Sequence, residues 1–416
     1  MKSKKQIVVV GGGFAGLSFV KDIDTDLFDI KLIDKLNHHQ FQPLFYQVAT
    51  SQIEPSSISF PLRYIFRNKK EIRIRLANVT NVDVKNNTIN TTIGDYRYDY
   101  LVLAMGCITN FFGNEEISKH ALTLKSTYDA INIRNHILQI FEDIINSESV
   151  DKQELLNIVI VGAGPTGVEL AGSFAEIKKE ILPKDFHRID FSKLKILLIE
   201  GSKNTLNNMS KKSHINSRKY LEKLGVEILT ETTVKNYDGE ILITDSGQII
   251  KTKTVIWAAG VIANTIQGIS KDSIRRGNRL KVDRINRLEG VDNVFVLGDM
   301  AYMETPLYPT GHPQLANVAI NQGKKLAHNL KRIELGKPTS EYEYKDLGTM
   351  ATVGKNKSVV DLPFMHIKGF FAWLIWMFLH LMLILNVRNK LIVFINWSWA
   401  YFTKNTALRI ILKDNK

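Results

Sequence analysis

The chain alternates short, largely apolar runs with longer mixed segments. Two of these runs, Ile7–Val10 and Asn157–Val161, are followed at once by a glycine-rich turn and then by a segment with helical spacing. Further apolar runs end near Ile33, Met105 and Ile199. Strands buried on both faces of a parallel sheet are near-continuous apolar runs, whereas half-exposed strands alternate. The pattern therefore predicts an α/β fold built on parallel sheets.

The first glycine turn, residues 11–16, fits the pattern Gly-x-Gly-x-x-Gly. Gly11 permits a sharp turn, Gly13 lets a pyrophosphate approach the backbone, and Gly16 lets helix and strand pack closely. The helix that starts here offers free N–H groups and a positive dipole end to phosphates. Asp34 ends the next strand, where a carboxylate accepts hydrogen bonds from a ribose diol. A dinucleotide site is predicted here.

The same module recurs later in the chain. Residues 162–167 form a second glycine turn, the next strand ends on Glu200, and a returning strand ends on Gly260 as the earlier one ends on Gly106. The turn and the returning glycine are 95 positions apart in the first copy and 98 in the second. Two copies at matching length predict two similar domains that bind two dinucleotides. A carboxylate at Glu200 favours NADH over NADPH, and Lys203 nearby is a contrary signal.

A chain with two such sites suits hydride transfer from a nicotinamide that comes and goes to a flavin that stays bound, because the protein supplies orientation. The alternative is that one of the two units is structural and empty. The single cysteine, Cys107, excludes a disulfide framework and a redox-active cysteine pair, and suits a reducing compartment.

A third apolar strand, Gly290–Leu297, leads into Gly298 and Asp299. Asp299 lies at a carboxyl end, where open α/β sheets bind ligands, and is a candidate to accept from a sugar hydroxyl or to cap a helix. Residues 312–323 are predicted to begin a helix whose amides stabilise charge on a reduced flavin.

Residues 37–50 are too mixed for a regular element and predict a loop packed onto the protein. His38 and His39 are interpreted as hydrogen-bonded loop histidines. No Cys or acid cluster accompanies them, so no metal site is predicted.

Charge and the C-terminal region belong together. The chain carries 55 Lys and Arg against 42 Asp and Glu, a net +13. Residues 364–416 contribute +6 of this, with seven Lys and Arg and only Asp414 as an acid, and they enclose the uncharged stretch Gly369–Val387. A basic excess suggests nucleic acid or an anionic membrane as partner. No nucleic-acid motif accompanies it, so nucleic acid is not expected.

The apolar stretch is borderline in length for a spanning helix, and a second apolar segment with Trp397, Trp399 and Tyr401 follows. A buried core helix, a transmembrane hairpin and a pair of interfacial helices compete. Recurring aromatic and basic residues favour the interfacial pair, facing the anionic cytoplasmic leaflet. The N-terminus shows no apolar signal region, so secretion is not expected.

The whole chain resembles the type II NADH dehydrogenases, single-subunit FAD-dependent NADH:quinone oxidoreductases of the two-dinucleotide-binding-domain flavoprotein superfamily. The resemblance is carried by residues 37–50, 162–172 (Gly-Ala-Gly-Pro-Thr-Gly-Val-Glu-Leu-Ala-Gly), 257–261, Gly298-Asp299 and the C-terminal run from Gly348. It implies tightly bound FAD in the first module and NADH in the second. The cofactor-binding residues expected from motif and resemblance are Gly11, Gly12, Gly13, Phe14, Ala15, Gly16, Asp34, Lys35, Val79, Gly106, Asp299, Ala316 and Asn317 for the first site, and Gly162, Gly164, Gly167, Glu200 and Gly260 for the second.

The resemblance also implies that Glu169 is the catalytic glutamate near flavin and quinone, assisting proton delivery. Its position alone indicates only a favourable acid in the first turn of a helix. The family usually shows Ala-Gln near the quinone tunnel, whereas this chain has Ala316-Asn317, which puts the quinone contact there in doubt. Disulfide reductases and sulfide:quinone oxidoreductases have similar architecture but need cysteine pairs, and one cysteine forms none.

The expected organisation is an FAD-binding domain (residues 1–112 and 278–340) with an inserted NADH-binding domain (113–277), then a membrane-association segment (341–416). The expected activity is NADH:quinone oxidoreduction without proton pumping: hydride passes to the flavin, then two electrons and two protons to a membrane quinone. The protein is expected to be peripheral on the cytoplasmic side of the inner membrane, bound to anionic lipid, with a homodimer as an option. The alternatives are a soluble FAD-dependent NAD(P)H reductase of a protein acceptor and a non-catalytic NADH-sensing flavoprotein.

Overall fold

The computed structural model describes residues 4–146, 155–406 and 408–412. The chain divides into two compact units. Unit 1 comprises residues 1–40, 60–108 and 261–345, and unit 2 comprises residues 41–59, 109–260 and 346–416. The predicted division into three functional domains stays a prediction, because compactness does not assign a function to each part.

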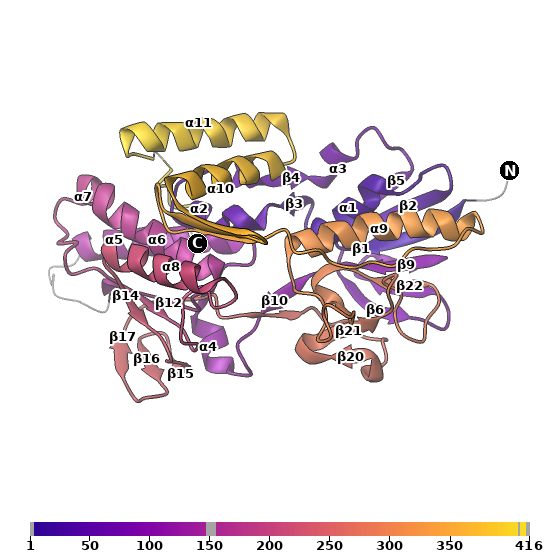
Figure 1. The fold of residues 1–416 in the computed structure, drawn as a ribbon, viewed down its shortest axis with the longest axis horizontal. Coiled ribbons are helices and arrows are strands. Elements are labelled where there is room, and N and C mark those ends of the chain that lie inside the picture. Colours follow the sequence, from indigo (N-terminus) through magenta and orange to yellow (C-terminus); the bar gives the residue numbers. More distant parts are fainter. Residues whose placement is uncertain (1–3, 147–154, 407, 413–416) are drawn as a thin grey trace. The chain divides into compact units, whose positions relative to one another are not determined.

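Unit 1 is built on a five-stranded parallel sheet in the order β22-β9-β1-β2-β5 (Figure 1). Its central strand, β1, buries Ile7 to Val10 and lies between β2 and β9. The near-continuous apolar run of β1 is thus explained by neighbours on both edges and by cover on both faces. The strands are β1 (Lys5–Val10), β2 (Phe28–Asp34), β5 (Ile72–Leu76), β9 (Tyr100–Leu103) and β22 (Val294–Val296).

Helices α1 (Phe14–Asp22) and α9 (Ala316–Glu334) pack directly on each other in unit 1. The contact is close because a Cβ added at Gly323 of α9 would overlap the carbonyl oxygen of Ala15 in α1. Glycine at this position therefore lets the two helix backbones approach.

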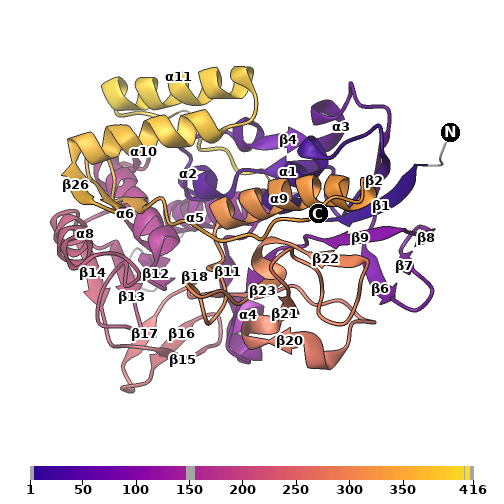
Figure 2. The ribbon, with the colours of Figure 1, turned by 45° about the vertical axis from the view of Figure 1, so that its right-hand side comes forward.

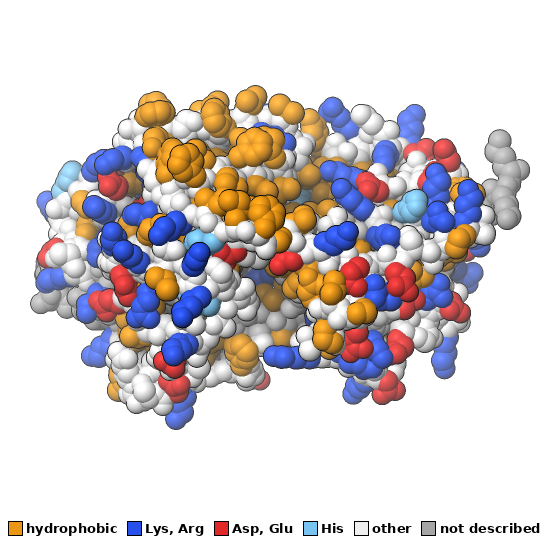
Figure 3. All heavy atoms as spheres, viewed as in Figure 1, with side chains coloured by type: hydrophobic (Ala, Val, Ile, Leu, Met, Phe, Trp, Pro, Cys, Tyr) orange, Lys and Arg blue, Asp and Glu red, His pale blue; other side chains and the backbone are white. Residues whose placement is uncertain are grey.

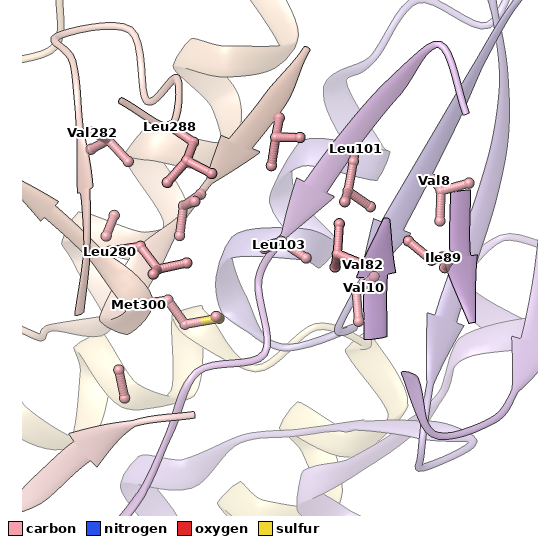
Figure 4. Packing of buried hydrophobic residues seen from close by; sticks show 14 of the residues in the cluster. Val8, Val10, Val82, Ile89, Leu101, Leu103, Leu280, Val282, Leu288 and Met300 are labelled. Carbon is pink, nitrogen blue, oxygen red and sulfur yellow. The ribbon is translucent and has the colours of Figure 1, made fainter. Parts of the chain in front are cut away.

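The other elements of unit 1 are short. Strands β6 (Val79–Asp83) and β7 (Thr88–Thr91) pair antiparallel and form a hairpin around Asn86 and Asn87. Figure 4 shows how side chains from these strands, such as Val82 and Ile89, meet side chains of β1, β9 and β21 in one apolar core. The remaining elements are β3 (His38–Gln40), α3 (Leu62–Ile65), β8 (Gly94–Arg97), β19 (Val261–Ala263), β20 (Ile274–Arg275), β21 (Arg279–Val282) and β23 (Ala301–Met303). The chain passes between the units after residues 40, 59, 108, 260 and 345, and the second and third of these crossings lie within β4 (Ser59–Pro61) and β10 (Cys107–Thr109).

Unit 2 repeats the local topology of unit 1. Its parallel sheet has the order β11-β18-β12-β13-β14, so the strand before the second glycine turn, β12, lies between β13 and β18 as β1 lies between β2 and β9. The predicted internal repeat is therefore confirmed. The strands are β11 (Leu122–Thr123), β12 (Asn157–Val161), β13 (Lys195–Ile199), β14 (Val226–Leu229) and β18 (Thr254–Trp257), with an antiparallel sheet of β15 (Val234–Tyr237), β16 (Ile241–Thr244) and β17 (Ile249–Lys251). The helices are α2 (Phe45–Ala49), α4 (Glu115–His120), α5 (Thr127–Asn146), α6 (Pro165–Glu180), α7 (Leu182–Asp185) and α8 (Lys211–Lys223).

The C-terminal part of unit 2 is an antiparallel sheet of β24 (Thr349–Thr352), β25 (Ser358–Leu362) and β26 (Met365–Gly369), followed by α10 (Phe370–Leu383) and α11 (Val387–Thr403). The two helices lie side by side in Figures 1 and 2. Each buries one narrow stripe at a spacing of four residues, namely Ala372, Trp376 and His380 in α10 and Asn389, Val393 and Trp397 in α11. Within the described residues, neither these helices nor any other is long and apolar enough to cross a membrane.

Two predictions from the sequence were wrong, one about where a helix begins and one about a segment predicted as a loop. The helix expected from residue 312 begins at Ala316, because Pro313 disfavours helical backbone at the residue before it and Leu315 is extended. The segment 37–50 is not a plain loop, since it contains β3, a 3₁₀ turn (Gln42–Leu44) and α2. Burial of its apolar side chains, including Phe41 and Phe45, explains the short helix that composition alone did not reveal.

The close contact between α1 and α9 gives a stability prediction. Gly323→Ala should destabilise the protein by about 1–3 kcal/mol, because the added methyl group overlaps backbone that cannot move aside. Thermal unfolding measures the loss. The control is Lys324→Ala on the exposed side of α9, expected to change stability by less than about 0.5 kcal/mol. Equal unfolding temperatures for wild type and the glycine variant would contradict the contact.

Candidate functional site

The first glycine turn of unit 1 has the geometry of a phosphate-binding turn. Gly11 has a φ of +104°, and a Cβ at Gly16 would overlap the Gly11 carbonyl, so both positions require glycine. Helix α1 starts at Phe14 with no side-chain cap and no acid in its first turn, an arrangement that favours an anion at its N-terminus. The space beside Gly13 is open.

Asp34 ties the end of β2 to this turn. Its Oδ2 accepts a hydrogen bond from the Gly12 N–H at 2.5 Å, and its Oδ1 accepts one from the Leu36 N–H at 2.7 Å. Burial raises the pKa of Asp34, and the two backbone N–H groups oppose that shift. The carboxylate is therefore fixed beside the turn, as a ribose-binding acid must be.

The other residues predicted for the first site follow carboxyl ends of the same parallel sheet. Gly106 follows β9 and has open space beside it, and Asp299 follows β22. The exposed Lys35 follows β2, and Val79 begins β6 shortly after β5. Because the carboxyl ends of parallel strands share one edge, the structure brings these residues to the edge that holds the glycine turn.

Asp299 and the start of α9 are positioned by their neighbours. The Cys107 thiol donates to Asp299 Oδ2 at 2.8 Å, and the Gln314 amide donates to the Asp299 carbonyl at 3.0 Å. Ala316 is the first residue of α9, and the Asn317 side chain accepts from Asn321 at 2.9 Å. The first turn of α9 carries no acid. Its amides are thus available to a negative ligand.

His39 is a contact of the first turn that the sequence did not reveal. Its Nδ1 lies 3.0 Å from the Gly12 carbonyl oxygen, and the Phe14 ring packs edge-on against it with centroids 5.1 Å apart. Burial lowers the pKa of His39 to about 4, so the imidazole is neutral near pH 7. His38 Nδ1 pairs with the Asn37 side-chain oxygen at 2.8 Å. Both histidines are hydrogen-bonded as predicted, but they lie in the strand β3 (His38–Gln40) and not in a loop.

The second glycine turn, in unit 2, repeats the first closely. Gly162 has a φ of +103°, and a Cβ at Gly167 would overlap the Gly162 carbonyl. Glu200 accepts from the Ala163 N–H at 2.6 Å and from the Ser202 N–H at 2.8 Å, as Asp34 does in unit 1. The two turns therefore have the same backbone geometry and the same hydrogen bonds to an acid.

The start of α6 is also open to a phosphate. Pro165 is its first residue, Gly164 has free space beside it, and no side chain caps the helix. Gly260 follows β18 with a φ of +109°. The five residues predicted for the second site thus lie in one unit, around the carboxyl edge of one sheet.

Glu169 points from the first half of α6 into the interior of unit 2 and is 8% exposed. Its Oε1 is 3.4 Å from the backbone nitrogen of Thr352 in β24. Burial raises the pKa of Glu169 to about 8, and the Thr352 N–H and the Trp376 indole act against this shift. The Trp376 indole N–H lowers the pKa by its proximity to the carboxyl group, because its nitrogen is buried and makes no hydrogen bond. At neutral pH the carboxyl group is mostly protonated and can donate a proton.

The wall around Glu169 is aromatic. Tyr46 of α2 packs edge-on to Trp376 with centroids 6.3 Å apart, and Trp376 stacks on His380 at 4.0 Å. The Gln47 amide donates to the Tyr46 hydroxyl at 2.9 Å and its oxygen accepts from the Trp397 indole at 2.8 Å. Burial and the charge of Glu169 raise the pKa of Tyr46. Sequence reasoning missed this wall, although Trp376 and His380 one helical turn apart were a usable signal.

A chain with two glycine-turn modules and a buried carboxyl group on the second helix has the architecture of a flavin- and nicotinamide-dependent oxidoreductase. The family described as pyridine nucleotide-disulphide oxidoreductase matches residues 5–323, and the NDH2 C-terminal domain matches residues 347–404.

A type II NADH:quinone oxidoreductase of Mycobacterium tuberculosis is 33% identical over 96% of this chain and 89% of its own length. One from Staphylococcus aureus is 30% identical over 86% of this chain and 90% of its own length. The chain therefore belongs to the type II NADH:quinone oxidoreductase family. A solved structure of NDH2 from Plasmodium falciparum in complex with NADH superposes with a TM-score of 0.90, at 22% identity, over 99% of this chain and 100% of that one, which confirms the fold.

The buried carboxyl group gives a pH-dependent stability prediction. The pKa of Glu169 is raised by burial, so the folded state holds a proton that the unfolded state releases, and stability falls as pH rises from about 4.5 to about 8. Glu169→Gln removes this contribution. The unfolding temperature of Glu169→Gln should therefore rise relative to that of wild type as the pH of the buffer is raised from 5 to 9. Glu222→Gln, which removes an exposed charge on α8, is the control. A constant difference between Glu169→Gln and wild type across that range would refute an acid held neutral by burial.

Proposed function

We propose that this protein transfers reducing equivalents from NADH through FAD to a membrane quinone. The observation that carries the proposal is the pair of complete glycine-turn cradles, one in each unit, each with its acid hydrogen-bonded to the turn. The two relatives named above support it, because both are named type II NADH:quinone oxidoreductases and align over most of this chain.

The residues of unit 1 fit FAD. The open space at Gly13 and Gly106 and the uncapped start of α1 leave room for a pyrophosphate, and Asp34 is held where a ribose binds. Asp299 follows β22 at the carboxyl edge of the same sheet and would hold the sugar-alcohol chain of FAD. The N-terminal amides of α9 would stabilise the negative charge of the reduced flavin ring. When bound, FAD supplies the hydride acceptor and the two-electron donor that side chains lack.

The residues of unit 2 fit NADH. Glu200, fixed by two backbone N–H groups, accepts from the ribose hydroxyls and repels a 2′-phosphate. Glu169 supplies a proton to the quinone oxygen during reduction, because burial keeps its carboxyl group protonated near pH 7. The shorter amide of Asn317, already bonded to Asn321, leaves the quinone contact at that position as an open part of the proposal.

The C-terminal helices are proposed to attach the protein to one leaflet. Their outward faces carry large apolar side chains, which gather over α10 and α11 in Figure 3. Exposed Lys368, Arg388 and Lys404 lie around them and suit the anionic cytoplasmic leaflet of the inner membrane. The apolar face of α10 and α11 consists of Phe370, Phe371, Leu374, Ile375, Phe378, Leu379, Met382, Leu383, Val387, Leu391, Phe394, Ile395, Trp399 and Phe402. The homodimer stays a prediction.

This face is oriented by the buried stripes on the other side. The Asn389 amide donates to the carbonyls of Ser56 and Ser57 at 3.0 Å each, and the Trp397 indole donates to Gln47. These hydrogen bonds hold the buried stripes against unit 2, and the large apolar side chains on the opposite face of the helices are exposed. An apolar surface of this kind marks a membrane or partner contact.

The activity is tested by steady-state NADH oxidation in liposomes against several quinones. Wild type should reduce quinone, and Glu169→Gln should lose about 10²-fold or more in quinone turnover, because general-acid groups contribute that much. Flavin reduction by NADH should stay near the wild-type rate in the variant. Turnover with a protein acceptor alone, or a long-lived NADH complex without turnover, would replace the proposal by a soluble reductase or a sensor.

Membrane attachment is tested by flotation with vesicles of anionic lipid. Phe378→Asp combined with Phe394→Asp should weaken vesicle binding by about tenfold or more, because two phenyl groups no longer enter the lipid. Ile249→Asp is the matched control, since Ile249 is 64% exposed on β17 outside the apolar face. Equal binding by the double variant and the control would argue against attachment through α10 and α11.

A further inference from the structure

We infer that Glu176 and Ser173 form a proton route along one face of α6, from the protein surface to Glu169. The inference rests on the proposed function, in which Glu169 gives a proton to quinone and must recover it. A carboxyl group buried to this degree has no direct access to bulk water. Some other group must therefore carry the proton in.

The route follows helical spacing. Glu169, Ser173, Glu176 and Glu180 are separated by four, three and four residues. Side chains three or four apart on an α-helix are neighbours, with Cβ atoms about 5–6 Å apart. The four residues therefore line one face over about 16 Å of helix, at 1.5 Å per residue.

Exposure increases along this face. Glu169 and Ser173 are buried, at 8% and 2% exposure. Glu176 is half-buried, and the Glu180 side chain is 36% exposed and paired with Lys404 at 3.1 Å. The face thus leads from the interior of unit 2 to its surface, and every position on it carries a group that can bind or pass a proton.

The turn after β24 is shaped around the Glu176 carboxylate. Glu176 Oε1 accepts from the Lys355 N–H at 2.5 Å. Gly354 has a φ of +98°, and a Cβ there would overlap the carboxylate. Gly172 of α6 also packs closely on the backbone of Val353. The turn after β24 therefore holds Glu176, while Thr352 at the end of β24 faces Glu169.

The charged groups around the route set the direction of transfer. Burial, together with Glu180, raises the pKa of Glu176 to about 6, while the Lys355 N–H, Lys357 and the Lys355 ammonium oppose the shift. The Lys355 ammonium is directed to Tyr401, donating to its carbonyl and lying 3.8 Å from its ring centroid. The neutral Tyr46 faces both acids.

Glu169, whose pKa is about 8, faces the Thr352 amide, Trp376 and Tyr46. Protons thus pass from a weaker base near the surface to a stronger base inside.

The proton balance is simple. NADH, quinone and one proton give NAD⁺ and quinol. The hydride of NADH supplies the electron pair and one of the two hydrogens of quinol, and Glu169 supplies the other as a proton. The O–H bond of Glu169 breaks as an O–H bond forms on quinone. The Ser173 hydroxyl then gives its proton to the Glu169 carboxylate and takes one from Glu176. Glu176 regains its proton from water at the surface beside Glu180.

The test uses the full-length flavoprotein with NADH and a short-chain quinone. Glu176→Gln should slow quinone reduction about tenfold or more at pH 8, within the range known for lost proton-transfer groups, and the loss should be smaller at pH 6. Flavin reduction by NADH should stay within about twofold of wild type, because that hydride step draws no proton through α6. Formate, a small weak acid, should restore part of the rate. Glu222→Gln on the surface of α8 should match wild type.

The outcomes separate the two proposals. A wild-type protein that does not reduce quinone would end the proposed function itself. A wild type that does so while Glu176→Gln keeps its full rate at both pH values would overturn the route alone. Where Glu176→Gln loses flavin or unfolds, Ser173→Ala decides, because it removes only one hydroxyl. An unchanged quinone rate in Ser173→Ala would then overturn the route, and a slower rate restored by formate would support it.

Discussion

The structure depends on one backbone contact that occurs in both units. A glycine in the first turn of a helix packs against the carbonyl group of the glycine that directly follows the preceding strand. At Gly16 and Gly167 any side chain would overlap the carbonyl of the preceding turn, so only glycine allows the approach. The same turn then donates an N–H to the acid at the end of the next strand, Asp34 or Glu200. Close packing and the geometry of the proposed nucleotide sites are therefore one constraint, because the contact that places the helix also places its N-terminal amides and the acid that is proposed to bind ribose.

Helix α6 serves more than one purpose within unit 2. Its first residues leave amides free for a phosphate, and its buried face carries Glu169 and Glu176 against β24 and the turn that follows. A charged carboxylate in this interior would be costly, so burial raises the pKa of Glu169 and keeps it mostly protonated near neutral pH, as its proposed role as a proton donor requires. The C-terminal sheet and helices contribute to this chemistry directly, because they supply Thr352 and Trp376 as its surroundings.

Much of this was predictable from sequence, for definable reasons. Parallel strands, glycine turns and their acids are encoded in a few adjacent residues, so β1, β12, Asp34 and Glu200 could be identified without a structure. The aromatic wall of Glu169 was only partly accessible in this way. Trp376 and His380 are one helical turn apart, but Tyr46 is more than 300 positions from Trp376 and meets it only through packing. The helix α9 starts at Ala316 and not at residue 312, because Pro313 disfavours helical backbone at the residue before it and Leu315 is extended. The proposed proton route along α6 rests on burial and on the shape of the turn at Gly354, and the helical spacing alone conveys neither.

The central claim is that electrons taken from NADH leave through the flavin to a quinone. The most direct measurement is anaerobic, with the flavin absorbance followed after NADH and then a short-chain quinone are added in sequence. The account predicts that NADH bleaches the flavin band and that quinone restores it, with quinol formed in equal amount. Bleaching that quinone does not reverse would contradict the account.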